Sequence, residues 1–177
     1  MASMLYITDG FRIEVPGLAR PTIQELRAVC PGIDSIEYDV SPTGPTVVVP
    51  GTVFAPEESN PMGGHEYEER FKPFLSTLIG YQQLRWFVMN QGQLQDSGLF
   101  RRRMFVAGLG LVVVDRRGLR RFPYLGRMWP FGRKARWGLI IDWAYLHQRA
   151  DKHDYLGVDR RTGSGDPDRL TQIGGET

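Results

Sequence analysis

The chain has 177 residues, 41% of them hydrophobic, and a formal net charge of +2, which is typical of one globular domain. Its single cysteine, Cys30, excludes an internal disulfide and a cysteine-rich zinc site. Residues 1–15 lack the basic and apolar regions of a secretory signal peptide, so we expect a protein that is not secreted by that route.

Two alternating runs of residues surround Asp9 and Gly10 near the start of the chain. An Asp-Gly pair in this position predicts a β-hairpin with a type I′ turn, because both central residues of that turn need a positive φ. Within residues 11–15 the odd positions are apolar and the even ones charged, so one face of the second strand is expected to be buried.

A short helix is predicted over residues 23–30, where Thr22 and Glu25 match a capping box. The next two apolar runs, 35–40 and 46–49, are separated by a turn-rich segment and predict two short strands.

Residues 65–90 predict the principal helix, or a pair of helices broken at Pro73. Apolar residues recur there every three to four positions. Three glutamates lie near its start, where the helix dipole favours negative charge.

The most distinctive feature is a basic arm, which we define as residues 99–137. It contains eleven of the 22 Lys and Arg of the chain and one acidic residue, Asp115, whereas the flanking segments are acidic. Two apolar runs, 106–114 and 119–125, predict a β-hairpin closed by Gly118 in the left-handed conformation. Pro123 places the second strand at an edge or a strand end, because proline cannot donate to the ladder.

Cations and large aromatic residues interleave along this arm. Arg and Trp are enriched in protein-interface hot spots, whereas cations with aromatic residues also suit phosphates and bases. In the alternative interpretation, the aromatic residues fill the core and the arginines are solvated. The candidate interface or nucleic-acid-binding residues are Arg101, Arg102, Arg103, Arg116, Arg117, Arg120, Arg121, Phe122, Tyr124, Trp129, Phe131, Arg133, Lys134, Arg136 and Trp137.

Residues 137–145 fit either a strand or a helix, and we favour a strand to Ile141 followed by a helix to Tyr155. Residues 159–177 are rich in Arg, Gly, Ser, Asp and Pro and predict a polar C-terminal tail. Residues 1–158 are then a single domain that includes the basic arm.

The sequence contains few residue patterns that indicate catalysis. There is no Gly-x-Ser-x-Gly elbow and no phosphate-binding Gly-Lys-Ser/Thr motif. The candidate metal cluster His147, Asp151, His153 and Asp154 is better explained as a solvated helix end, and Cys30 as a small buried hydrophobic residue. We therefore expect no catalytic residues, no metal and no cofactor.

These patterns predict an α+β fold with short antiparallel strands, one principal helix and a projecting basic β-hairpin arm. We expect a non-enzymatic structural or adaptor subunit of a large oligomeric assembly that docks on other protein subunits, copies of itself included. A virion or phage-tail-like particle is the expected setting, with the virion or the cytoplasm as location. A nucleic-acid-binding module is the alternative, and a small hydrolase using His147 or Glu66 is a third class. The longest apolar run is about half of the ~20 residues that a membrane-spanning helix needs.

Overall fold

The computed structural model describes residues 2–100, 105–128 and 138–160. Within them, three short α-helices accompany a sheet of nine mostly antiparallel strands, which confirms the α+β class. In chain order the elements are β1 (Tyr6–Ile7), β2 (Ile13–Val15), α1 (Ile23–Val29), β3 (Ile33–Asp39), β4 (Thr46–Thr52), α2 (Gly64–Phe71), the 3₁₀-helix η1 (Lys72–Thr77), α3 (Tyr81–Met89), the 3₁₀-helix η2 (Gln91–Leu94), β5 (Phe105–Ala107), β6 (Leu111–Asp115), β7 (Arg120–Met128), β8 (Gly138–Tyr145) and β9 (Asp154–Asp159).

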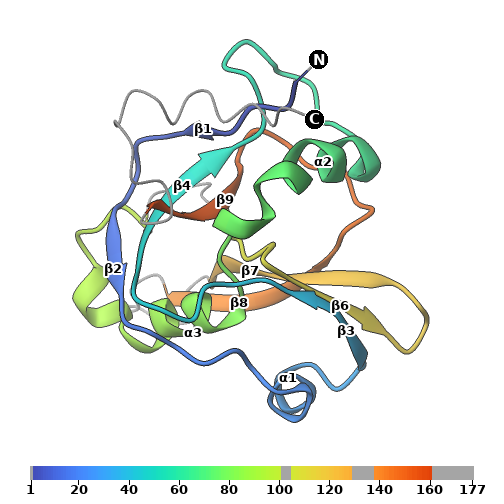
Figure 1. The fold of residues 1–177 in the computed structure, drawn as a ribbon. Coiled ribbons are helices and arrows are strands. Elements are labelled where there is room, and N and C mark those ends of the chain that lie inside the picture. The colour runs from blue at the N-terminus through green and yellow to red at the C-terminus, as the bar shows by residue number, and fades with distance from the viewer. Residues whose placement is uncertain (1, 101–104, 129–137, 161–177) are drawn as a thin grey trace.

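Two strands, β4 and β7, organise the sheet (Figure 1). β4 pairs with β1 and β2 along one edge and with β9 along the other. β7 pairs with β6 and then β5 along one edge, and with the whole of β8 along the other. A parallel pair, β5 with β9, joins the two halves, and β3 extends the sheet beyond β6.

Residues 108–110 interrupt the strand that the sequence predicted over 106–114. Both parts of that strand still pair with β7, and the predicted loop closes this hairpin with Gly118 at φ +79°. The chain between η1 and α3 crosses the sheet at the interruption, because Gly110 donates a backbone hydrogen bond to Ile79 and Ile79 donates one to Gly157. A Cβ atom on Gly110 would lie 2.5 Å from the carbonyl oxygen of Leu78, so only glycine allows this close approach.

Local sequence signals explain the helices. The Thr22 side chain accepts a hydrogen bond from the Glu25 N–H, and the Glu25 carboxylate accepts one from the Thr22 N–H, so the predicted capping box is present. The predicted pair of helices broken at Pro73 is confirmed in part, because α2 ends just before Pro73 but a 3₁₀-helix follows directly and the non-helical break lies at residues 78–80. Pro73 lies in the first turn of η1, which follows α2, and Gly80 is the N-cap of α3.

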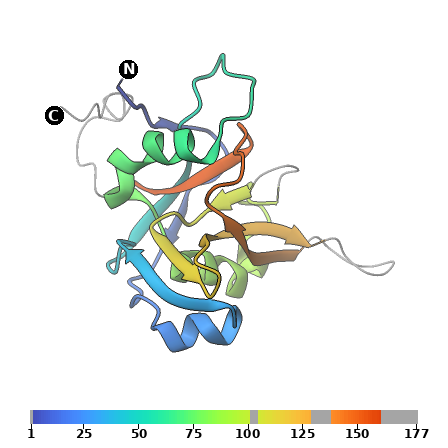
Figure 2. The same ribbon diagram turned by 90° about the vertical axis from the view of Figure 1, so that its right-hand side faces the viewer.

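Buried side chains cover both faces of the sheet. Tyr67 and Phe71 of α2 pack on one face, and Leu84 and Phe87 of α3 pack on the other. A third cluster, around Leu26, joins α1 to β3 and β6. Figure 2 shows α1 beside β3 at one end of the molecule.

The predicted N-terminal hairpin is wrong. β1 and β2 do not pair with each other, because both lie antiparallel to β4, with Asp9 and Gly10 in the bend between them. Among the glycines of the described residues, positive φ occurs at Gly98 and Gly118, so Gly10 does not adopt the type I′ geometry. The alternation was interpreted correctly, since Phe11, Ile13 and Val15 are buried.

Pro123 lies in the middle of β7, so the prediction that it marks an edge or a strand end is wrong. Its carbonyl accepts a hydrogen bond from the Gly108 N–H at 2.8 Å, at the interruption between β5 and β6. Because the nitrogen and the oxygen of one strand residue point to the same edge, the missing donor of Pro123 also faces this interruption. The ladder therefore loses no hydrogen bond there.

The favoured helix from residue 142 to Tyr155 is also wrong. β8 continues to Tyr145, opposite Arg121, and a turn region then leads into β9. Residues 142–145 form a strand because β8 pairs with β7 along its whole length. Asp159, the first residue of the predicted tail, is buried at the end of β9, and residues 161–177 lie outside the described residues.

Candidate functional site

The structure brings six of the predicted site residues together on the hairpin formed by β6 and β7. These are Arg116, Arg117, Arg120, Arg121, Phe122 and Tyr124. The other nine lie outside the described residues: Arg101, Arg102, Arg103, Trp129, Phe131, Arg133, Lys134, Arg136 and Trp137. How the basic arm projects is therefore not described beyond Met128.

Arg120 joins three elements of the fold. Its two Nη atoms donate to the carboxylate of Glu68 on α2 at 2.8 and 2.7 Å, and its Nε donates to Glu37 on β3 at 2.8 Å. These hydrogen bonds lower the pKa of Glu68 and raise that of Arg120. All three nitrogen atoms of the Arg120 guanidinium thus donate to carboxylates of the acidic N-terminal part of the chain.

Asp115 holds the hairpin loop in place. Its side chain is 4% exposed, and its Oδ1 accepts hydrogen bonds from the N–H groups of Leu119 and Arg117 at 3.0 and 2.9 Å. Arg121 Nε donates to its Oδ2 at 3.1 Å. The backbone donors, together with the charge of Arg121, lower the pKa of Asp115.

Two of the hairpin arginines contact Tyr145 on β8. Arg117 donates to its hydroxyl at 2.7 Å, and Arg121 also donates to this hydroxyl. The Arg121 guanidinium lies 4.3 Å from the centre of the Tyr145 ring, which is a cation–π distance. Within the described part of the chain, only Arg116 of the four hairpin arginines is exposed without a side-chain partner.

A cavity of about 250 Å³ lies on the α2 side of the sheet, next to these arginines. It is bounded by β5, β7, β8 and β9, by α2 and by the turn at residues 146–150. Its walls include six aromatic side chains and two charged ones: Tyr67, Phe105, Phe122, Tyr124, Tyr145, Tyr155, Arg149 and Asp154. Phe122 and Tyr124, which the sequence singled out, thus contribute to a concave surface.

Strand register explains how this wall forms. Tyr124 lies opposite Asp142 of β8 on one side and opposite Ala107 of β5 on the other, and Phe105 lies beside Asp154 of β9. The rings of Phe105 and Tyr124 meet edge to face, with their centres 6.1 Å apart. The Tyr124 hydroxyl donates to Asp142 Oδ2 at 3.3 Å.

Tyr67 of α2 covers the cavity from the other side. It is 3% exposed, and its hydroxyl has no hydrogen-bond partner among the described residues. Burial raises the pKa of Tyr67, and the carboxylate of Asp154 raises it further, so these two groups lie within electrostatic range of each other. Burial also raises the pKa of Asp154.

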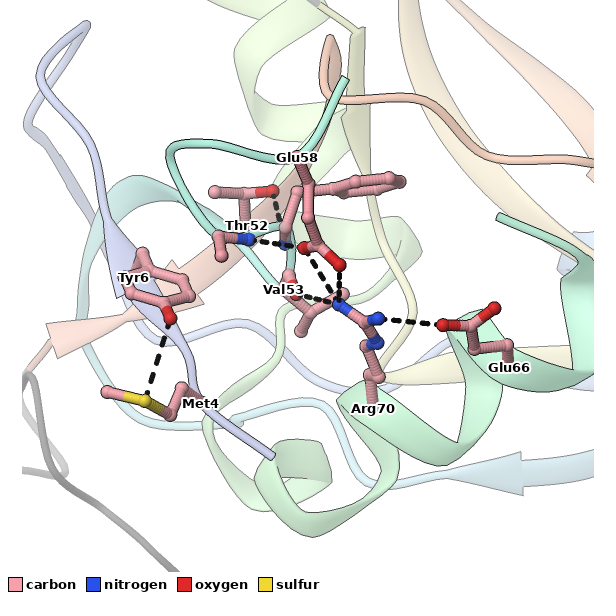
Figure 3. A network of polar contacts seen from close by, with 9 residues as sticks. Met4, Tyr6, Thr52, Val53, Glu58, Glu66 and Arg70 are labelled. Atoms are coloured by element: carbon pink, nitrogen blue, oxygen red, sulfur yellow. Dashed lines mark hydrogen bonds and ion pairs between the residues drawn. The ribbon is translucent and has the colours of Figure 1, made fainter. Parts of the chain in front are cut away.

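Close contacts fix the position of α2 above the cavity. Arg70 donates to Glu58 at 2.8 Å and to Glu66 at 2.7 Å, which ties the helix to the loop after β4 (Figure 3). Its Nη1 also donates to the carbonyl oxygen of Val53 at 3.3 Å. At the first residue of α2, a Cβ atom on Gly64 would lie 2.5 Å from the Leu146 carbonyl oxygen.

The described residues give little geometric support to a metal site, a reactive cysteine or a membrane-spanning helix. In the described ranges no three His, Cys, Asp or Glu residues are grouped so that they could hold a metal ion. Cys30 packs, partly buried, against the cluster around Leu26. No helix among the described residues combines the length and the apolar character needed to cross a membrane.

The sequence did not indicate Tyr67 or Phe105 as site residues, and it indicated Asp154 only as a candidate metal ligand on a helix that does not form. They come from α2, β5 and β9, which are far apart in the sequence and meet only through the parallel β5–β9 pair and the packing of α2.

Comparison of this chain with protein-family models, with curated proteins and with solved structures finds no match.

Proposed function

We propose that this chain is a non-enzymatic structural or adaptor subunit of a larger oligomeric assembly. It contacts other protein subunits, copies of itself included, through the surface around β7, β8 and the basic arm. The observation that carries the proposal is the cavity, at which Phe105 is 42% exposed beside Tyr124. Concave, aromatic surfaces of this kind anchor protein partners. A virion or a phage-tail-like particle is the proposed setting, in keeping with a small, turn-rich, cysteine-poor chain.

The state of the hairpin arginines supports a protein partner over a nucleic acid. Arg117, Arg120 and Arg121 already bind carboxylates or tyrosine of their own chain, so a phosphate would have to displace these groups. The net attraction that these three arginines offer to a phosphate backbone is correspondingly small.

Nucleic-acid binding is the second candidate, and the charge of the basic arm favours it. Arg116 is exposed, and the arm carries further cations outside the described residues. In this alternative those cations contact phosphates, while Phe122 and Tyr124 stack on bases.

Replacing Phe105 with alanine tests the proposed function. Hot-spot aromatic residues contribute about 2 kcal/mol or more to association, so Phe105→Ala should weaken assembly by at least about tenfold in native mass spectrometry. Met89→Ala is the matched control, because Met89 is 70% exposed on α3, on the other face of the sheet. Equal assembly of Phe105→Ala and wild type would contradict docking at this surface.

A further inference from the structure

Two charged side chains that line the cavity have unused hydrogen-bonding groups. The guanidinium of Arg149 makes no hydrogen bond or ion pair with any described residue. Asp154 Oδ2 accepts the backbone N–H of Asp151 at 2.8 Å, whereas Asp154 Oδ1 has no partner within the described ranges. This Oδ1 keeps accessible surface, because it is not among the buried side-chain oxygens that lack a partner in the described part of the chain.

A short turn brings these two side chains to the same side of the cavity. The Asp154 N–H donates to the carbonyl oxygen of Asp151 at 3.0 Å while the Asp154 carboxylate accepts the Asp151 N–H, so the turn between Arg149 and Asp154 is tightly closed. Among the contacts of the described residues, no ion pair joins Arg149 to Asp154. This side of the cavity therefore offers N–H donors and an accessible carboxylate oxygen.

The opposite charges of Arg149 and Asp154 determine the charge of the group that fits between them. A cation would be attracted by Asp154 and repelled by Arg149, and an anion would experience the reverse. A neutral group that both donates and accepts satisfies both side chains without this repulsion, and hydrogen bonds to charged groups are the stronger ones. The matching occupant is therefore neutral and carries a donor and an acceptor close together.

The rest of the wall is largely aromatic and suits a ring. Phe105 is 42% exposed beside Tyr124, so its ring can pack against a further ring. Aromatic pairs prefer edge-to-face or offset arrangements, with ring centres about 4.5–7 Å apart. The volume of about 250 Å³ is below the roughly 300–1,000 Å³ of pockets that enclose a whole drug-sized ligand, so a single side chain fits it better.

Among the natural side chains, tyrosine meets all of these requirements. Its phenolic oxygen both donates and accepts, whereas an indole only donates and a benzyl ring does neither. Asparagine and glutamine carry a donor and an acceptor but no ring. A neutral imidazole places its donor and its acceptor on two ring atoms that point apart, and it gains a positive charge near pH 6.5.

We infer that this cavity binds a tyrosine side chain of a partner protein. The inference rests on the proposed function for the source of the tyrosine, while the volume, the aromatic wall and the two unpaired charged groups determine its chemistry. The tyrosine ring packs against Phe105 and Tyr124. Its hydroxyl donates to Asp154 Oδ1 and accepts a hydrogen bond from Arg149.

Titration of the full chain with N-acetyltyrosine amide, followed by NMR chemical shifts, tests the inference. N-acetylphenylalanine amide is the matched ligand, because it lacks only the hydroxyl. We expect tyrosine amide to bind at least about tenfold more tightly, since hydrogen bonds to charged groups contribute a factor of that size. Equal binding of the two, no binding of tyrosine amide, or tighter binding of the tryptophan analogue would overturn the inference. Tighter binding of guanosine would overturn it as well and would favour a nucleic acid.

Arg149→Met locates the binding site. It should lower the affinity for tyrosine amide by about tenfold and leave that for phenylalanine amide unchanged, because it removes only the donor to the hydroxyl. Arg149 has no partner among the described residues, so the variant should fold as well as the wild type. Arg12→Met, at an exposed arginine just before β2, is the matched control and should keep the wild-type preference. An undiminished preference for tyrosine amide in Arg149→Met would overturn the assignment.

The two proposals fail separately in this design. Selective binding of tyrosine amide by a chain that does not assemble would contradict the proposed function and support the chemistry of the cavity. Assembly that depends on Phe105, in a chain that does not distinguish tyrosine amide from phenylalanine amide, would support the proposed function and overturn the tyrosine assignment.

Discussion

Gly63 and Gly64 are neighbours in the sequence, but their surroundings differ. A Cβ atom on Gly64 would lie within 2.6 Å of backbone atoms of His147, in addition to the Leu146 carbonyl oxygen. Nothing lies within 4 Å of the corresponding position on Gly63. The contact at Gly64 brings the start of α2 against the turn that borders the cavity.

Alanine at these two positions should therefore have opposite consequences. Gly64→Ala should lower the free energy of unfolding by about 1–3 kcal/mol, because backbone atoms must shift to accept the methyl group. Gly63→Ala, whose φ of −66° suits alanine, should stay within about 0.5 kcal/mol of wild type. Urea denaturation of both variants measures the difference, and equal stabilities would contradict the close approach.

The sequence identified only part of the candidate site. The interleaved cations and aromatic residues pointed to Phe122 and Tyr124, which are close together in the chain and share a strand face. Tyr67 and Asp154 could not be found in this way, because their presence at one cavity depends on the docking of α2 and on the pairing of β9. Neither of these is encoded in a local pattern.

The side chain of Arg120 on β7 connects this strand to α2 and to β3. Arg120 binds Glu68 and Glu37 while 34% of its side chain is exposed. Arg116, from the same hairpin, is exposed and makes no such ion pair. These two arginines therefore form a matched pair for mutation.

Arg120→Met should destabilise the fold by about 1–2 kcal/mol, because it leaves Glu68 without its bidentate partner. Arg116→Met should change the stability by less than about 0.5 kcal/mol. Thermal and urea unfolding would reveal the contrast. If the two substitutions cost the same, the ion pairs of Arg120 do not stabilise the arrangement of the three elements.

The same contact predicts a dependence of stability on pH. Hydrogen bonds from Arg120 hold the pKa of Glu68 below its usual value of 4.5 in the folded protein. The stabilisation is therefore complete above about pH 4.5 and is lost as the pH falls through the lowered pKa. The difference in the free energy of unfolding between wild type and Arg120→Met should shrink between pH 5 and about pH 3. A difference that stays constant over this range would contradict the coupling.

Elements with local signals were predicted well, and elements defined by distant pairing were not. The capping box of α1 and the loop at Gly118 each depend on residues within a few positions of one another. The bend at Asp9 and Gly10 resembles a hairpin turn in sequence, yet β4 provides a partner for both flanking strands. Residues 142–155 have an ambiguous period, and only the pairing of β8 with β7 determines their structure.

For the whole molecule, the charge segregation in the sequence is partly cancelled in space. The basic hairpin lies next to the acidic N-terminal part, where Glu37 and Glu68 bind Arg120. The sequence alone showed a strongly basic segment between two acidic ones. The folded surface around the cavity instead combines paired arginines with exposed aromatic side chains, which is why we favour a protein partner.

Light scattering of the purified chain, with and without a single-stranded oligonucleotide, distinguishes self-assembly from nucleic-acid binding. At physiological salt we expect a mass above that of the monomer that rises with protein concentration and does not change when the oligonucleotide is added. A monomer that binds the oligonucleotide, with log K falling by about 0.7 per phosphate contact for each unit of log[salt], would contradict the proposed subunit function and favour nucleic-acid binding.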